Sequence, residues 1–174
     1  MNYSVIKLIK SDLSRICKPT IGNFFKWYFL PRGSTFPYLV WFRITSFVKH
    51  RRFLKYTVGI PCYLMYRHLG FKYGISIDTG VEVGPELLIV HGGCVFLNCK
   101  KIGNHCTFYQ CVTLGSDRSN EIPTIENNVT IYTGAVVVGN IVIEDNATVG
   151  CNSYVHKDVK KNTTVAGNPA RPIQ

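Results

Sequence analysis

Between Ile77 and Val155 an aliphatic or aromatic residue recurs at every sixth position, with two changes of register. One extra residue falls at Lys100–Lys101, and five fall between Leu114 and Ile125. A strict period of six matches neither the 3.6-residue period of a helix nor the alternation of an ordinary strand. The thirteen positions are Ile77, Val83, Ile89, Val95, Ile102, Phe108, Leu114, Ile125, Ile131, Val137, Ile143, Val149 and Val155.

This period predicts a mainly β protein, a parallel β-helix in which each six-residue repeat forms one side of a triangular coil. Every sixth side chain then points inward, and residues about 18 apart stack in neighbouring coils. Burial of each Val or Ile contributes about 1.5–3 kcal/mol. The stacked inward-pointing residues, which we call the ladder, can therefore stabilise the domain without layered sheets. A sandwich of short alternating strands is the alternative, and thirteen positions in register disfavour it. The period leaves handedness open, although the general crossover preference favours a right-handed coil.

Residues 1–74, which precede the repeat, have a different composition. They contain 13 Lys and Arg against one acidic residue, and 17 of the 22 aromatic residues. Apolar spacing predicts helices over residues 2–16, 36–58 and 60–70. The segment 115–124 contains the five extra residues between Leu114 and Ile125. We expect it to leave the coil as a protruding loop, and such loops often carry function.

The longest uncharged run of the basic region is Tyr56–Tyr66, with 11 residues. A membrane span needs about 18 or more, so none is expected. A helical cap on the first coil is one interpretation, and peripheral contact with an anionic membrane surface can accompany it. The region contains no recognised nucleic-acid motif, so we expect no nucleic-acid partner. Lys7, Lys10 and Asp12 interrupt the first apolar run, which disfavours a signal peptide.

The seven cysteines form no CxxC pair, and five of them lie within the repeat. This spacing disfavours a disulfide framework and a zinc site. We therefore expect small buried hydrophobic side chains in a reducing cytoplasm.

The repeats Ile102–Thr107 and Val149–Tyr154 resemble those of the hexapeptide-repeat acyltransferases, whose coils are left-handed. Three further segments, Ile89–Val95, Val112–Gly115 and Ala166–Arg171, resemble the serine acetyltransferase branch. The resemblance implies an acetyl-CoA-dependent O-acetyltransferase that needs no metal. We expect the chain to consist of a helical region (1–74), a left-handed β-helix acyltransferase domain (75–165) and a C-terminal extension (166–174).

His91 is the candidate catalytic residue. It lies two residues after a repeat position, and Gly92-Gly93 leave room beside its ring. Neutral imidazole suits removal of a hydroxyl proton, and in the resembling family His91 falls on the general base. The resemblance implies direct acetyl transfer, with the Gly115 N–H stabilising the oxyanion. The acceptor site would add Gln110, Ser76 and Asp78.

In the resembling enzymes coenzyme A lies in a groove between adjacent β-helices, which implies a homotrimer with active sites between subunits. The corresponding residues here are small, polar or cationic, and cations suit phosphates. They are Gly134, Ala135, Asn152, Ser153, Ala166, Gly167, Lys157 and Arg171.

Departures from the serine acetyltransferase pattern predict the acceptor. That family has aspartates where Ser76 and Val90 stand here, and an Arg-His pair at Glu121-Ile122. An amino acid binds poorly without opposite charges. We therefore predict a glycan acceptor of capsule, O-antigen or another exported glycan, or its lipid-linked precursor. The enzyme would be cytoplasmic, at the inner face of the membrane. Serine O-acetyltransfer is the alternative, followed by a β-helix metal hydratase and a non-catalytic scaffold.

Overall fold

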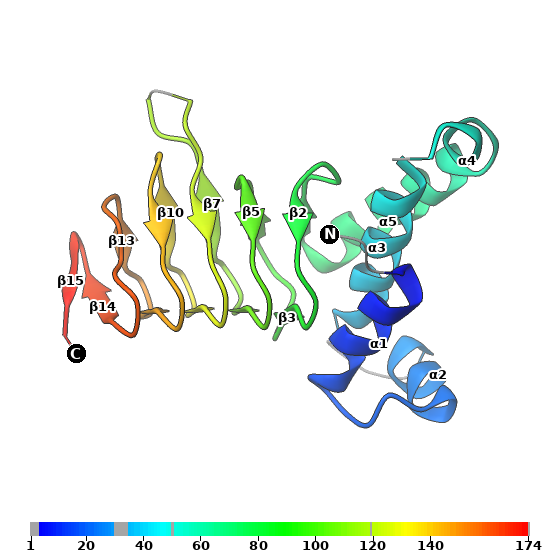
Figure 1. The fold of residues 1–174 in the computed structure, drawn as a ribbon, viewed down its shortest axis with the longest axis horizontal. Coiled ribbons are helices and arrows are strands. Elements are labelled where there is room, and N and C mark those ends of the chain that lie inside the picture. Colours follow the sequence, from blue (N-terminus) through cyan, green and yellow to red (C-terminus); the bar gives the residue numbers. More distant parts are fainter. Residues whose placement is uncertain (1–3, 30–34, 50, 119, 174) are drawn as a thin grey trace.

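The computed structural model describes residues 4–29, 35–49, 51–118 and 120–173. A group of helices lies at one end, and a β-helix of about five coils extends from it to the C-terminus (Figure 1). The mainly β, left-handed parallel β-helix with a helical N-terminal region is confirmed. The division at 74/75 and 165/166 into separate domains stays a prediction.

The helices of the N-terminal region are α1 (Val5–Ser14), α2 (Ile21–Phe29), α3 (Phe36–Lys49), α4 (Arg52–Thr57) and α5 (Gly59–Tyr73). The predicted helix 36–58 is therefore two helices, α3 and α4. The predicted helix 60–70 continues past Gly70 because Gly74, at φ 63° and ψ 43°, supplies the left-handed residue that ends it. No helix was predicted for the aromatic run that forms α2.

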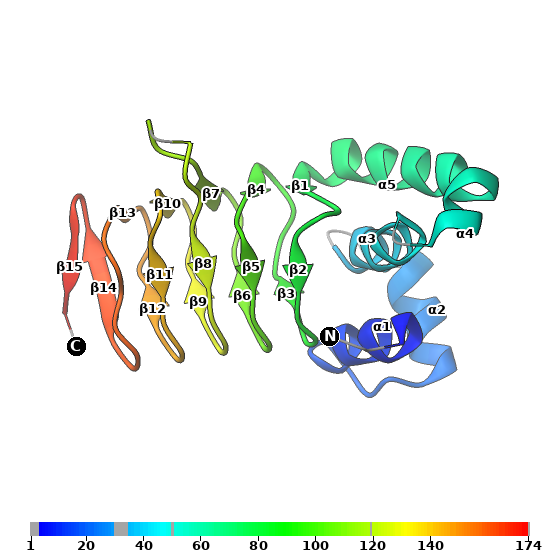
Figure 2. The same ribbon diagram turned by 45° about the horizontal axis from the view of Figure 1, so that its top comes forward.

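Three parallel sheets form the sides of the β-helix, and Figure 2 shows how they follow one another around each coil. Sheet A contains β1 (Ile75–Ile77), β4 (Val95–Leu97), β7 (Thr113–Gly115), β10 (Val136–Val138) and β13 (Tyr154–Val155). Sheet B contains β2 (Glu82–Val83), β5 (Lys101–Ile102), β8 (Thr124–Ile125) and β11 (Val142–Ile143). Sheet C contains β3 (Leu88–Ile89), β6 (Thr107–Phe108), β9 (Thr130–Ile131), β12 (Thr148–Val149), β14 (Thr164–Gly167) and the antiparallel β15 (Ala170–Pro172).

All thirteen repeat positions are buried, with at most 9% of any side chain exposed. The register of the second coil corrects the predicted position of the extra residue. Ile77 pairs with Leu97, and Val95 pairs with Ile75. Seven positions separate Ile89 from Phe96, whereas five separate their partners Phe108 and Thr113. Two extra residues therefore enter at the turn that holds His91, and one residue is lost between Leu97 and Ile102.

The five extra residues between Leu114 and Ile125 do leave the coil as predicted, and Figure 1 shows this loop projecting beyond β7. The loop is closed by a hydrogen bond from the Asp117 N–H to the Glu121 carbonyl, 3.3 Å. Its base is fixed to the preceding coil by Lys100, whose Nζ lies 2.9 Å from Glu121.

A buried ion pair joins the helical region to the first coil. Arg43 of α3 contacts Asp12 of α1 through two nitrogens, at 2.8 and 3.0 Å. The same guanidinium donates to the carbonyls of Val83 and Gly84, while the Leu87 N–H donates to Asp12 at 2.9 Å. Burial raises the pKa of the Asp12 carboxyl, and Arg43 opposes that rise. The pair thus satisfies backbone groups at the turn between β2 and β3, in the first coil of the β-helix.

Candidate functional site

His91 and most of the predicted donor-site residues lie along one edge of the prism, where each coil turns from sheet C into sheet A. Lys157 is an exception, because it lies between Val155 of sheet A and Val159, which bridges to sheet B. Register places Gly74, Cys94, Cys111, Gly134 and Asn152 above one another at this edge, which we call the C–A corner. All five have a positive φ, between 53° and 72°. The sequence alone could not align these positions, because the turn lengths differ between coils.

His91 lies on an enlargement of the C–A corner that is unique among the coils whose register is described. His91 and Gly92 have no counterparts in the next coil, where Tyr109 leads directly into Gln110. A side chain at Gly92 would come within 2.6 Å of the Tyr73 carbonyl, and the Gly93 N–H donates to that carbonyl at 2.7 Å. Only glycine fits at Gly92, so this contact holds the turn against α5 and leaves the His91 side chain exposed.

Gln110 occupies the same corner one coil further on. Its backbone carbonyl accepts from the Gly134 N–H at 3.2 Å. The side-chain oxygen Oε1 of Gln110 is buried and has no hydrogen-bond partner among the described residues. A buried acceptor without a partner is costly, so Gln110 is a polar group available to a ligand at this corner.

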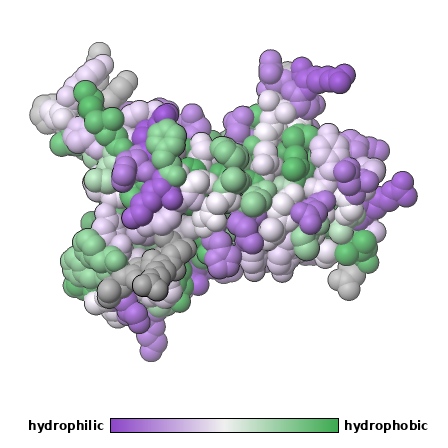
Figure 3. Space-filling model, turned by 180° about the vertical axis from the view of Figure 1, so that it is seen from behind, coloured by the Kyte–Doolittle hydropathy of each residue, from purple (hydrophilic) through white to green (hydrophobic). Residues whose placement is uncertain are grey.

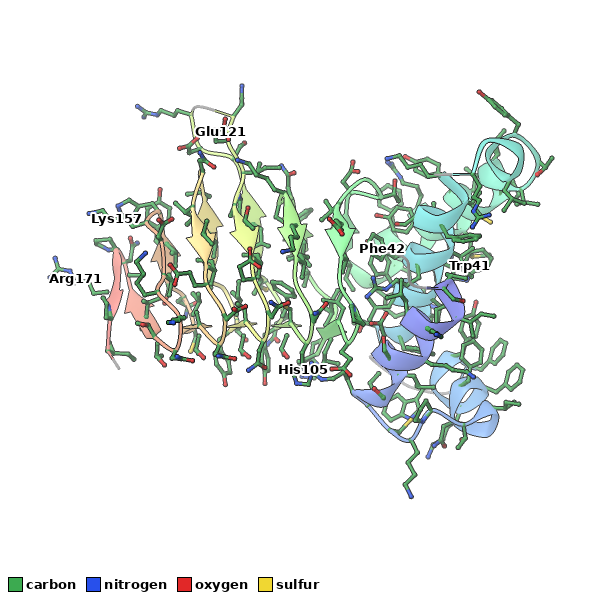
Figure 4. All side chains as sticks on the ribbon, in the orientation of Figure 1. Trp41, Phe42, His105, Glu121, Lys157 and Arg171 are labelled. Carbon is green, nitrogen blue, oxygen red and sulfur yellow. The ribbon has the colours of Figure 1, made fainter. Side chains whose placement is uncertain are left out.

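The last coils continue the corner with small and polar residues. Ser153 is buried, and its Oγ accepts from the Gly167 N–H at 3.2 Å. Ala166 pairs with Arg171 across the β14–β15 hairpin. Lys157 and Arg171 extend into solvent at this end of the molecule (Figure 4). Ala135 differs from the others because its side chain faces the core and is fully buried.

The cysteines divide into two groups. Burial raises the pKa of the Cys99 thiol to about 12 and that of Cys106 to about 11, so neither is a thiolate at neutral pH. Cys94, Cys111 and Cys151 are exposed at the C–A corner, contrary to the expectation of buried side chains. Their repeat positions belong to the turns, where side chains point outward.

Ser76 and Asp78 line a cavity of about 690 Å³ between the helices and sheet A. Two cations from the helices, Lys49 of α3 and Arg67 of α5, also line it. Lys49 Nζ lies 3.7 Å from Asp78 Oδ1 and 3.1 Å from Thr79 Oγ1. Arg67 lies over the rings of Tyr63 and Phe71, at 6.0 and 5.1 Å. The sequence analysis missed both cations, because nothing in the helical pattern shows which helix covers which strand.

Asp78 and Gly115 lie at the edge of sheet A opposite the C–A corner. Four residues separate Gly74 from Asp78, which corresponds to about 13 Å along a strand. A single chain therefore does not bring His91 together with Asp78 or with the Gly115 N–H. Ser76 stands between the two edges, two residues after the corner.

The described residues contain no group of three or more His, Cys, Asp or Glu side chains placed to hold a metal ion. Among the same residues, no helix combines the length and hydrophobicity that a membrane span requires.

The proteins similar in sequence to this chain include serine acetyltransferases from several bacteria. No family model matches the chain. The serine acetyltransferase of Staphylococcus epidermidis is 40% identical over 108 residues, which cover 60% of this chain and 51% of that protein. The chain thus spans about half the length of the relatives it matches.

The solved structures agree in fold. A serine acetyltransferase in complex with CoA superposes with a TM-score of 0.79 over 99% of this chain and 71% of that chain, at 22% identity. The Neisseria gonorrhoeae serine acetyltransferase in complex with serine gives a TM-score of 0.75 over 97% of this chain and 68% of that chain, at 25% identity.

The predicted glycan acceptor, and with it a role in polysaccharide biosynthesis, is wrong, because the relatives and the solved structures are serine acetyltransferases. The error had a physical cause. We sought the charges that hold an amino acid only at positions such as Val90 and Glu121. In the structure Lys49 and Arg67 of the helices line the cavity beside Asp78, and Glu121 is paired with Lys100 rather than left as an uncompensated acid.

The six-residue ladder, the corner with its enlarged turn at His91 and the similarity over 108 residues lead to one assignment. The chain has the left-handed β-helix fold of hexapeptide repeats found in the serine acetyltransferases, and its sequence is similar to theirs over 108 residues.

Proposed function

We propose that the chain transfers the acetyl group of acetyl-CoA to the hydroxyl of L-serine. The observation that carries this proposal is the 40% identity to a serine acetyltransferase over 108 residues, which cover 60% of this chain. The cavity beside sheet A supports it, because an amino acid needs charged partners for both its ammonium and its carboxylate.

In the proposed mechanism His91 is the general base. It takes the proton from the serine hydroxyl while the oxygen attacks the thioester carbon. The carbon–sulfur bond then breaks, and the proton passes from His91 to the departing thiolate of coenzyme A. The Gly115 N–H stabilises the intermediate oxyanion. No acyl-enzyme is needed, and the two buried thiols, with raised pKa values, are unsuited to form one.

The acceptor is held by the charged residues of the cavity. Asp78 receives the ammonium group, and Lys49 and Arg67 receive the carboxylate, with Ser76 lining the wall between them. Lys49 is free to exchange partners, because its ion pair with Asp78 is half exposed and 3.7 Å long. Surface pairs of this kind contribute little stability.

The donor lies along the C–A corner. The small residues Ala166 and Gly167 leave room beside the backbone. At Gly134 the place of a side chain is taken by the amide of the exposed residue Asn152. Lys157 and Arg171 suit the phosphates of coenzyme A. Gln110 Oε1 accepts a hydrogen bond from the bound substrates. Ala135 and Ser153 shape the corner from within the coil.

The separation of the two edges of sheet A supports a site shared between copies of the chain. His91 of one subunit would face the cavity and the Gly115 N–H of the next, which a homotrimer can repeat three times. The cytoplasm, where acetyl-CoA is available, is the proposed location.

The assay mixes purified protein with acetyl-CoA and L-serine, and measures O-acetylserine by mass spectrometry and free coenzyme A thiol by absorbance. Glycine, which has no hydroxyl, is the matched negative acceptor. Formation of O-acetylserine that depends on serine supports the proposal. Thiol release without O-acetylserine, or no turnover at millimolar serine, overturns it.

Mixed trimers test the shared site. Chains with His91→Ala and chains with Lys49→Ala, each inactive or weak alone, should regain activity when they assemble together. If activity is not regained while both variants assemble, each site lies within one chain.

A further inference from the structure

Helix α2 buries none of its residues completely, although six of its nine residues are aromatic or Ile. Its partly buried side packs Phe24, Trp27 and Tyr28 against a small cluster with Phe36. The other side carries Ile21, Phe25 and Phe29, with 80%, 54% and 72% exposed. These three residues follow one another at intervals of four, so they form one apolar line along the helix. We call this line the α2 stripe.

The helical region also carries a second group of exposed apolar side chains, away from the α2 stripe (Figure 1). At the junction of α4 and α5, Tyr56 is 74% and Ile60 is 69% exposed. Figure 3 shows hydrophobic residues gathered at the helical end of the molecule, beside hydrophilic ones. Several large apolar side chains exposed together indicate an interaction surface for a protein, a membrane or a ligand.

The charge around this surface has one sign. Residues 1–74 contain a single acidic residue, Asp12, which is 1% exposed and ion-paired with Arg43. Lys18 and Lys26 flank the stripe and are exposed. The helical end therefore presents apolar side chains and cations with no exposed carboxylate of its own.

We propose that the α2 stripe is a docking surface for an anionic lipid membrane. The three apolar side chains enter the interface, where α2 lies in the membrane plane, and the lysines contact anionic headgroups. A second copy of the same surface is a poor partner, since two cationic faces repel each other. The proposal concerns the helical end alone and does not depend on the identity of the acceptor.

The test is co-sedimentation of the full-length protein with two vesicle preparations, pure phosphatidylcholine and phosphatidylcholine with 30% phosphatidylglycerol. We expect binding to the anionic vesicles that falls as NaCl rises from 0.1 to 1 M, because the screening length shortens from about 10 Å to about 3 Å. The double variant Phe25→Ser/Phe29→Ser should lower the partition coefficient by about tenfold or more. Lys18→Glu/Lys26→Glu should lower it by at least about fivefold.

Matched variants on the β-helix control for general loss of hydrophobicity or charge. Ile173→Ser removes a side chain that is 63% exposed, and Lys160→Glu/Lys161→Glu reverses two exposed cations. Both should bind vesicles nearly as the parent does. Circular dichroism confirms that each variant remains folded.

Equal binding to neutral and anionic vesicles, or no binding, overturns the proposal. If Phe25→Ser/Phe29→Ser instead changes the molar mass in light scattering and leaves lipid binding unaltered, the α2 stripe is an interface between copies. Both results are independent of the acetyltransferase assay.

Discussion

The β-helix and the helical region are stabilised by different kinds of contact. Each coil of the β-helix repeats the same inward side chains, and every repeat position is buried. The helical region relies on more varied contacts, including the Asp12–Arg43 pair and the tilted, hydrogen-bonded rings of Tyr38 and Tyr66. It also leaves large apolar side chains on its surface, as along the α2 stripe.

This difference shows where each region can vary. A ladder that is buried at every step tolerates insertions of outward-pointing turn residues, because these do not contribute to the core. The enlarged turn at His91 and the loop 115–124 are both such changes. The residues that depart from the repeat are thus the ones available for chemistry.

The largest expected effect concerns the enlarged turn. His91→Ala should lower kcat by about 10²–10⁴, the usual contribution of a general base, while thermal stability stays nearly unchanged, since the His91 side chain is exposed. Steady-state kinetics with acetyl-CoA and serine measures it. His105→Ala is the control, because His105 lies at another corner and pairs with Glu86 at 2.6 Å. Equal decreases of kcat in the two variants would contradict the proposed role of His91 as general base.

The next effect concerns the junction between the two regions. Asp12→Ala leaves the Arg43 guanidinium buried without its carboxylate, which typically costs about 3–5 kcal/mol. Urea unfolding followed by circular dichroism measures the change in the free energy of unfolding. Asp145→Ala is the control, since Asp145 is exposed and its contacts with Asn127 lie on the surface. A loss below about 1 kcal/mol for Asp12→Ala would mean that the helical region docks without this pair.

A smaller effect concerns the cation that the helices contribute to the cavity. Lys49→Ala should raise the KM for serine by about 10–100-fold, which corresponds to one hydrogen bond to a charged group. The KM for acetyl-CoA should stay within about twofold, because the donor residues lie along the C–A corner. The exposed Lys7 of α1 provides the control variant Lys7→Ala. A parallel rise of both KM values would contradict a role confined to the acceptor.

The sequence was sufficient for the β-helix, because burial of the repeat positions depends on a period that is visible along the chain. It also pointed to His91, since two glycines follow it. The register around His91 could not be predicted, because Val95 and Leu97 are both buried and only strand pairing shows which one continues the ladder. The cavity could not be predicted either, since Lys49 and Asp78 are 29 positions apart and meet only after α3 packs on sheet A.

The smallest effect concerns an ion pair on the surface of the β-helix, between Glu144 and Lys160 at 3.0 Å. The hydrogen bond from Lys160 holds the pKa of the Glu144 carboxyl below its usual value of 4.5. A carboxyl whose pKa is lower in the folded state stabilises the fold above its unfolded pKa, and this contribution disappears as the pH falls through the folded value. Glu144→Gln should therefore lower the melting temperature slightly at pH 7 and leave it unchanged near pH 2. Thermal unfolding at both pH values, with and without 1 M NaCl, measures this difference. Salt should remove most of it, because both side chains face solvent and are screened. A loss at pH 7 that rivals that of Asp12→Ala would show that the β-helix also depends on individual polar contacts, against the contrast with the helical region.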